Sequence, residues 1–374
     1  MIVTKAYKFR IYPNKRQAIL MAMHFGSTRF VWNHFLALRK DSYLENKESL
    51  TYYDNSKALT ILKKDNEYEW LKDVNSQSLQ ASLKDLDTAY GRFFKKQAKF
   101  PKFKSKHKAI DSFRCPQFVV IKDGKLFLPK FREGIRIKLH RETIDEILFV
   151  TVSRTPTNKF FASITYESEH EVLPLTDNEV GIDLGIKDLI TCSDGKIFNN
   201  PKTTNKHAKK LAYEQRQLSK KEKGSKKRFK QKKIVAVVHE TIKNVRADNL
   251  HKITHSIISN NKTIIIEDLH VKGMIKNHCL AKAITDASWG ELSRQFEYKA
   301  RWNERSFTKV DRWFPSSKTC NVCGFINQDL LLKNRKWTCP QCKTMLGRDL
   351  NAAKNILKQG LKTLSGSGAE SDAK

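Results

Sequence analysis

The spacing of apolar and polar residues divides the first third of the chain into a strand and a long helical stretch. Residues 4–12, TKAYKFRIY, alternate with the two-residue period of a strand. From residue 15 to residue 97 apolar side chains recur at helical spacing. A loop is expected to begin near Tyr52, and Asn75 is a plausible N-cap for the last long helix of this block.

Residues 113–170 return to the period of β-strands. FVVIKDGKLFLP indicates two short strands joined across Asp123-Gly124, and LFVTVSRTPTNKFFASITYES indicates a second hairpin. Strands at this spacing favour a small barrel. If the first strand of the chain joins that barrel, the helical block is an insertion into it.

A third region, mixed in strands and helices, begins near residue 178. EVGIDLGIKDLITCSDGKIF predicts a strand and then a hairpin that turns at Ser193-Asp194-Gly195. Residues 202–260 predict two helices, and KTIIIEDLH predicts a buried strand with acidic residues at its end. DASWGELSRQFEYKARW predicts an amphipathic helix. DLNAAKNILKQG predicts a last helix stopped by glycine, and we expect the tail that follows to be disordered.

Composition adds the class of partner. The chain has 71 Lys and Arg against 39 Asp and Glu, a formal net charge of +32, which favours a polyanionic partner. No run of eighteen apolar residues and no apolar signal core is present, so nucleic acid is favoured over a membrane, and a cytoplasmic location is expected.

Two basic segments are candidates for contact with that partner. Residues 202–233 hold fourteen Lys and Arg against two Glu and predict a helical hairpin that turns at Lys223-Gly224-Ser225. Its candidate nucleic-acid-binding residues are Lys209, Lys210, Arg216, Lys227 and Arg228. Residues 98–110, AKFPKFKSKHKAI, interleave basic and aromatic side chains. Each segment is also explained by a solvated surface, and both explanations stay open.

Four of the seven cysteines predict a metal site. Cys320-x₂-Cys323 and Cys339-x₂-Cys342 can present four thiolates at the corners of a tetrahedron, the geometry that Zn²⁺ prefers. Gly324 and Lys343 follow the two pairs, where the chain has to turn sharply. Redox chemistry needs only one such pair. A closed four-thiolate site has no open position, so this zinc is expected to be structural.

Three carboxylates predict a second, catalytic metal site. Asp183 lies in Gly-Ile-Asp-Leu-Gly at the end of an apolar strand, and Glu267 ends the strand Ile264-Ile265-Ile266. An acid at the end of a buried strand needs a positive partner, and Mg²⁺ or Mn²⁺ is a natural one. Asp349 begins the last helix, where an aspartate is common as a cap. Together in a very basic chain, the three acids favour a metal-dependent nuclease that binds a scissile phosphate.

At this point the sequence resembles the TnpB (OrfB) family of transposon-encoded RNA-guided DNA endonucleases, relatives of the single-effector type V CRISPR nucleases. The resemblance covers nearly the whole chain. Its motifs are YKFRIYPNKRQ, RFVWNHFLALR, VGIDLGIKDL, IIIEDLHVKGMIKN, SWGELSRQFEYKARW, FPSSKTCNVCG, and WTCPQC followed by GRDLNAAKNIL. Many relatives carry a histidine shortly before the last Arg-Asp. Here that stretch is Met345-Leu346-Gly347-Arg348-Asp349, so the acid is kept and the histidine is not.

The resemblance implies a multidomain α+β architecture. A wedge-like β-barrel is expected over residues 1–14 and 98–177, interrupted by a helical recognition lobe over 15–97. A RuvC nuclease domain of RNase H-like α/β fold is expected over 178–315 and 346–362, with a zinc ribbon over 316–345 and a disordered tail over 363–374. The family's catalytic acids fall on Asp183, Glu267 and Asp349, and its zinc ligands fall on Cys320, Cys323, Cys339 and Cys342.

The resemblance also implies the activity and the partners. The expected activity is cleavage of double-stranded DNA beside a transposon-adjacent motif, directed by a guide RNA from the transposon end, with Mg²⁺ at the acids and a monomeric protein in a prokaryotic cytoplasm. Tyr52, Ser56 and Gln80 are candidate contacts to the adjacent motif, although each is equally explained as a cap or a surface residue. The alternatives are a guided DNA-binding regulator that does not cleave, and an RuvC-like resolvase or transposase that acts without RNA.

Overall fold

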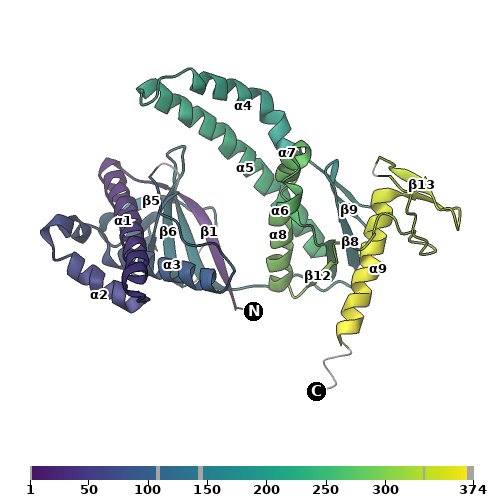
Figure 1. Ribbon diagram of the computed structural model, residues 1–374, viewed down its shortest axis with the longest axis horizontal. Helices are drawn as coiled ribbons and strands as arrows, with labels where there is room; N and C mark the ends of the chain where they lie inside the picture. The colour runs from purple at the N-terminus through teal and green to yellow at the C-terminus, as the bar shows by residue number, and fades with distance from the viewer. Residues whose placement is uncertain (1, 107–109, 142–145, 332, 369–374) are drawn as a thin grey trace. The chain divides into compact units, whose positions relative to one another are not determined.

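The computed structural model describes residues 2–106, 110–141, 146–331 and 333–368 (Figure 1). The chain forms two compact units, one from Ile2 to Glu169 and one from His170 onward. The boundary between them lies eight residues before the one expected at residue 177. Each unit has its own core and is described by itself.

The N-terminal unit is built on one antiparallel sheet of seven strands in the order β2-β6-β7-β1-β5-β4-β3. The first strand of the chain lies between β7 and β5, so it joins the sheet as expected, and the helical block is an insertion. Among the described residues no ladder joins β2 to β3, so closure into a barrel stays a prediction. The strands are β1 (Ile2–Tyr12), β2 (Asp111–Cys115), β3 (Val120–Lys122), β4 (Lys125–Leu128), β5 (Phe131–Lys138), β6 (Ile147–Arg154) and β7 (Phe160–Glu169).

The helical insertion has its own core, and its helices begin at clear capping residues. Asn75 caps the last helix, as the sequence predicted. The prediction of a loop from Tyr52 was wrong. Tyr52 begins a helix, because Thr51 and Asp54 form a capping box at its N-terminus. The loop lies earlier, after Asn46. The elements are α1 (Lys15–Asn46), α2 (Tyr52–Leu62), the 3₁₀ helix η1 (Asn66–Lys72) and α3 (Ser76–Phe94).

The C-terminal unit is built on a mixed sheet of five strands in the order β10-β9-β8-β11-β12. The first three strands form an antiparallel meander, which turns at Gly195 in a left-handed conformation (φ 90°). β11 runs parallel to both β8 and β12. These strands are β8 (Glu179–Leu184), β9 (Asp188–Cys192), β10 (Ile197–Asn199), β11 (Thr263–Glu267) and β12 (Ser306–Val310).

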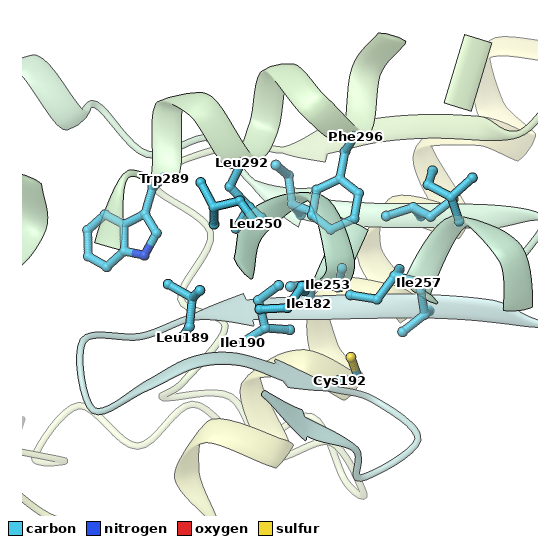
Figure 2. Close-up of a cluster of buried hydrophobic side chains, with 14 of the residues drawn as sticks. Ile182, Leu189, Ile190, Cys192, Leu250, Ile253, Ile257, Trp289, Leu292 and Phe296 are labelled. Carbon is cyan, nitrogen blue, oxygen red and sulfur yellow. The ribbon is translucent and has the colours of Figure 1, made fainter. Parts of the chain in front are cut away.

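Helices pack on both faces of this sheet. On one face, side chains of α5 and α8 cover Ile182, Leu189 and Ile190 (Figure 2). On the other face α9 lies so close that a Cβ on Gly181 would be 2.2 Å from the carbonyl oxygen of Ala353. The helices are α4 (Thr203–Ser219), α5 (Lys226–Asn260), α6 (Val271–Met274), α7 (His278–Ala287), α8 (Trp289–Trp302) and α9 (Arg348–Gly368), and β13 (Lys336–Thr338) and β14 (Met345–Gly347) form a small hairpin before α9.

Two predicted helix boundaries were wrong. The helix expected from Asp286 is broken at Ser288, whose backbone is left-handed (φ 54°). Asp286 therefore lies in the last turn of α7, which ends at Ala287, and Trp289 begins α8. The last helix does not stop at Gly360 but continues to Gly368, so residues 363–368 of the expected disordered tail are helical. A Cβ on Gly360 would lie 2.4 Å from Cγ2 of Ile265, so this glycine serves close packing. Residues 369–374 lie outside the described part of the chain.

Candidate active site

The fold brings Asp183 and Glu267 to the face of the sheet that α9 covers. Successive side chains along a strand point to opposite faces. Asp183 is two residues after Gly181, which touches α9, and Glu267 is two residues after Ile265, which packs against Ile356 of α9. β8 and β11 are neighbouring parallel strands, so both acids lie near the same edge of the sheet. Asp349 lies in the first turn of α9.

The side chains of Asp183 and Glu267 are hydrogen-bonded to each other. Burial raises the pKa of Asp183 well above its usual value. The hydrogen bond that Asp183 donates to Glu267 and the charges of Glu267 and Asp349 raise this pKa further, while Arg348 acts in the opposite direction. Burial also raises the pKa of Glu267. Two carboxylates this close are stable only when a proton or a cation offsets their charge. This is the electrostatic environment of an oxygen-ligated cation site.

Asp349 is close enough for its charge to raise the pKa of Asp183, but the carboxylate of Asp349 is itself paired with two arginines. Its Oδ2 lies 3.1 Å from Nη1 of Arg335, and its Oδ1 lies 3.1 Å from Nη2 of Arg348. Arg335 precedes β13, and its carbonyl oxygen also accepts the backbone N–H of Arg348 at 2.9 Å. In the described part of the chain, only the four cysteines bring three or more candidate ligand atoms within 4.8 Å of one another. The oxygens of Asp183, Glu267 and Asp349 therefore do not all lie within 4.8 Å of one another.

The four cysteines form a second, separate cluster. Sγ of Cys320 lies 3.6 Å from Sγ of Cys342, and Sγ of Cys323 lies 3.6 Å from Sγ of Cys339. A tetrahedral zinc with bonds of about 2.3 Å sets its sulfurs about 3.8 Å apart, so the cluster fits zinc.

The two CxxC turns are equivalent. The N–H of Gly324 bonds to the carbonyl of Cys320 at 2.9 Å, and the N–H of Lys343 bonds to that of Cys339 at 3.0 Å. Both residues are left-handed (φ 80° and 58°), which confirms the sharp turns expected after each pair.

Two asparagines that the sequence did not single out connect α9 to the segment that leads into the cysteine cluster. Nδ2 of Asn351 donates to the carbonyl of Thr319 at 2.7 Å, and its Oδ1 accepts the N–H of Asn321 at 2.9 Å. Nδ2 of Asn355 donates to the carbonyl of Ser316 at 2.8 Å. Both are almost fully buried. The sequence did contain a signal for this role. The two asparagines are four residues apart and so lie on one face of the helix, among alanines and isoleucine, where a polar side chain needs a hydrogen-bond partner.

The basic segment 202–233 forms the predicted helical hairpin from α4 and α5 (Figure 1). Lys209, Lys210, Arg216 and Lys227 are exposed on it. Arg228 is half-buried and donates to the carbonyls of Leu218 and Lys221 at 2.7 and 2.9 Å, so it also holds the end of α4.

Asp286, which the sequence did not single out, anchors the base of the hairpin. Its carboxylate accepts from the backbone N–H of Thr204, at the start of α4, and from Arg246 of α5.

In the N-terminal unit, Tyr52 and Gln80 line one hollow of about 370 Å³, together with Lys84 and Arg114. Ser56 is not part of its lining, and its carbonyl accepts the hydroxyl of Thr60. Residues 98–106, from the segment that interleaves basic and aromatic side chains, dock on α1. There Nδ2 of Asn33 donates to the carbonyl of Lys104, and its Oδ1 accepts the N–H of Lys104. These residues are therefore held in a defined place.

The chain has relatives along nearly its whole length. A Streptomyces pristinaespiralis protein named "Putative RNA-guided DNA endonuclease" is 40% identical over 362 residues, which cover 96% of this chain and 90% of the relative. An Escherichia coli K12 protein named "Putative RNA-guided DNA endonuclease InsQ" is 35% identical and covers 95% and 92%. The OrfB_IS605 family model, described as "Probable transposase", matches residues 163–278. The chain belongs to the TnpB (OrfB) family.

Two further family models match parts of this TnpB-family chain. A "Cas12f1-like, TNB domain" model matches residues 289–356, which include all four cysteines and Asp349. A "Helix-turn-helix domain" model matches residues 1–48, which here form β1 and α1. The cryo-EM structure of a Cas12f1-sgRNA-target DNA complex aligns over 96% of this chain and 100% of that one, at 14% identity and a TM-score of 0.37. None of the described helices has the length and apolar character needed to cross a bilayer.

Proposed function

We propose that this protein is an RNA-guided endonuclease that cleaves double-stranded DNA beside a transposon-adjacent motif. The observation that carries the proposal is the hydrogen-bonded pair of Asp183 and Glu267 facing the start of α9, beside Asp349. Two relatives that align over nearly the whole chain are named as RNA-guided DNA endonucleases, which supports the guided nuclease part of the proposal. The strand order β10-β9-β8-β11-β12, with its antiparallel meander and two parallel additions, supports an RNase H-like domain of RuvC type.

Mg²⁺ or Mn²⁺ is the proposed catalytic metal, held by Asp183, Glu267 and Asp349. The donor set fits, because these hard cations prefer carboxylate oxygens and the pair requires a positive partner. When bound, such ions polarise a scissile phosphate and activate water. Asp183 and Glu267 would supply the fixed negative charge. Arg348 and Arg335 offset the charge of Asp349 and add positive potential where a phosphate would approach.

The remaining parts of the chain are proposed to hold the nucleic acids. The α4–α5 hairpin presents exposed lysines and arginines to a guide RNA or its duplex, which proteins recognise through shape and backbone. The hollow lined by Tyr52 and Gln80 is proposed to contact the DNA motif beside the target, and Ser56 stays a weaker candidate. The cysteine cluster is proposed to hold structural zinc, separate from catalysis.

The test uses purified protein with its guide RNA, Mg²⁺ and a plasmid that carries the matching target. Wild type should cut the plasmid, and Asp183→Ala should bind it but cut at least about 100-fold more slowly, because a metal ligand is lost. Asp194→Ala is the control: that carboxylate accepts the N–H of Lys196 in an exposed turn, so cleavage should be retained.

Each alternative function makes a different prediction in the same experiment. Binding without cutting by wild type identifies a regulator. Cutting without guide RNA identifies an RNA-independent nuclease and overturns the guided part of the proposal.

A further inference from the structure

Trp313 is exposed in a way that the other described tryptophans are not. Trp313 is 84% exposed, whereas Trp32, Trp289 and Trp337 are at most 8% exposed, Trp302 is half-buried and Trp70 is 40% exposed. The indole therefore presents a large apolar ring face to solvent.

The backbone that carries Trp313 is fixed on both sides of it. Oδ1 of Asp311 accepts the N–H of Trp313 at 2.7 Å. Phe314 packs against the core of Ile265, Val310 and Ile356. On the N-terminal side of Trp313, Nη2 of Arg312 lies 2.8 Å from Oδ2 of Asp268. The turn therefore holds the indole out into solvent between two anchored neighbours.

This turn lies at the edge of the sheet where the acids gather. Val310, the last residue of β12, is the register partner of Glu267, the last residue of β11. The N–H of Asp268 then bonds to the carbonyl of Val310 at 3.1 Å. Trp313 follows Val310 by three residues and precedes the first cysteine of the cluster by seven.

Two cations and two acids lie around the turn. Lys309 and Arg312 are exposed beside it, and the carboxylate of Asp268 is paired with Arg312. Asp311 is an exposed acid that binds the backbone of the turn. An exposed indole next to cations is the combination by which proteins hold unpaired nucleotides, because the ring stacks on the face of any base.

We propose that Trp313 is a substrate-positioning residue that stacks on an unpaired base of the strand led to Asp183 and Glu267. The inference rests on the proposed nuclease function of those acids. Stacking needs a free base face, so the occupant is single-stranded nucleic acid. The indole would hold the strand beside the acids without touching the reacting atoms.

The test measures binding of a fluorescein-labelled (dT)₁₀ oligonucleotide to the full chain without guide RNA and without added Mg²⁺ or Mn²⁺, so that cleavage does not occur and the structural zinc is kept. Trp313→Ala should weaken binding by about fivefold or more, the usual scale for one lost base–aromatic stack, and Trp313→Phe should stay within about twofold of wild type. The slope of affinity against salt should not change, because no charge is removed.

Leu175→Ala is the matched control, because Leu175 is an apolar residue that is 89% exposed in the same unit, and it should bind like wild type. A 5-iodouracil oligonucleotide should crosslink to the peptide that contains Trp313 and lose that product in Trp313→Ala. Equal affinity of Trp313→Ala and wild type, with no such crosslink, overturns the proposal. Loss of self-association in sedimentation at unchanged oligonucleotide affinity also overturns it and makes a second copy the partner.

These results are separable from the proposed function. Failure of Asp183→Ala to reduce cleavage would count against the nuclease assignment, whereas (dT)₁₀ affinity reports on Trp313 alone. Because Trp313 is exposed, thermal stability of Trp313→Ala should match wild type. If Trp313→Ala is destabilised, Trp313→Leu keeps an apolar side chain, and weakened binding by that variant carries the same conclusion.

Discussion

The C-terminal unit holds two candidate metal sites that are prepared to different degrees. The four cysteine sulfurs already stand at distances suited to one ion, and their turns are fixed by backbone hydrogen bonds. In the acid cluster only Asp183 and Glu267 are hydrogen-bonded to each other, while Asp349 is paired with Arg335 and Arg348. A closed, assembled site suits a structural ion. At the acid cluster, two carboxylates lie close together without a cation, and the third acid is paired with arginines. These features suit a site at which ions, water and phosphate exchange.

The largest expected effect comes from breaking the assembled site. Cys339→Ser should abolish zinc binding and unfold the segment from about residue 316 to 345, because structural zinc supplies about 10–16 kcal/mol to comparable small folds. Zinc content by mass spectrometry and limited proteolysis of that segment measure the effect. Cys279→Ser, which removes an exposed cysteine outside the cluster, should change neither. Full zinc content in Cys339→Ser would contradict the assignment.

A smaller effect is expected from the acid pair without metal. The folded-state pKa of Asp183 lies above its unfolded value, so the fold favours the protonated acid and loses stability as pH rises from about 4 towards the folded pKa. Asp183→Asn removes that loss. Without added Mg²⁺ or Mn²⁺, its melting temperature should therefore exceed that of wild type by an amount that grows with pH, by about 2–4 °C for each kcal/mol.

Thermal unfolding at several pH values from about 4 upward measures this difference. Asp194→Asn is the matched control, because that carboxylate lies in an exposed turn, and it should follow wild type. A pH-independent difference between Asp183→Asn and wild type would show that the pair carries no raised pKa.

The smallest effect is expected from releasing Asp349. Arg335→Gln removes one of its two cations, so Mg²⁺ should bind the free chain up to about fivefold more tightly, the scale of an exposed ion pair. The rise of melting temperature with Mg²⁺ measures the affinity. Lys336→Gln removes an exposed charge from the next position and should change it less. Weaker Mg²⁺ binding by Arg335→Gln would mean that the arginine helps to organise the acids.

Local patterns in the sequence predicted much of this arrangement. The two-residue period on strands explains why Asp183 and Glu267 share a face, and spacing alone identified the two CxxC turns. The hairpin at Asp123-Gly124 and the pause at Lys223-Gly224-Ser225 were also readable, because turn chemistry is local.

Features that depend on contacts between distant segments were not readable. Gly360 looks like a helix stop until Ile265 is seen against it. Arg335 is one of many basic residues until the cysteine-bearing segment folds it beside Asp349. Asp286 looked like the start of a helix, whereas its carboxylate binds Thr204 and Arg246, which are 82 and 40 residues away in the chain.

The order of the acids along the chain has a consequence for synthesis. β8 and β11 leave the ribosome first, with Asp183 and Glu267, and the cysteine cluster follows before Asp349 arrives with α9. Asn351 and Asn355 then connect α9 to the segment leading into that cluster. If the three acids act together as proposed, a growing chain carries an incomplete site until α9 has been made and docks. Cleavage would then begin only after the segment that carries the cysteines has folded against α9.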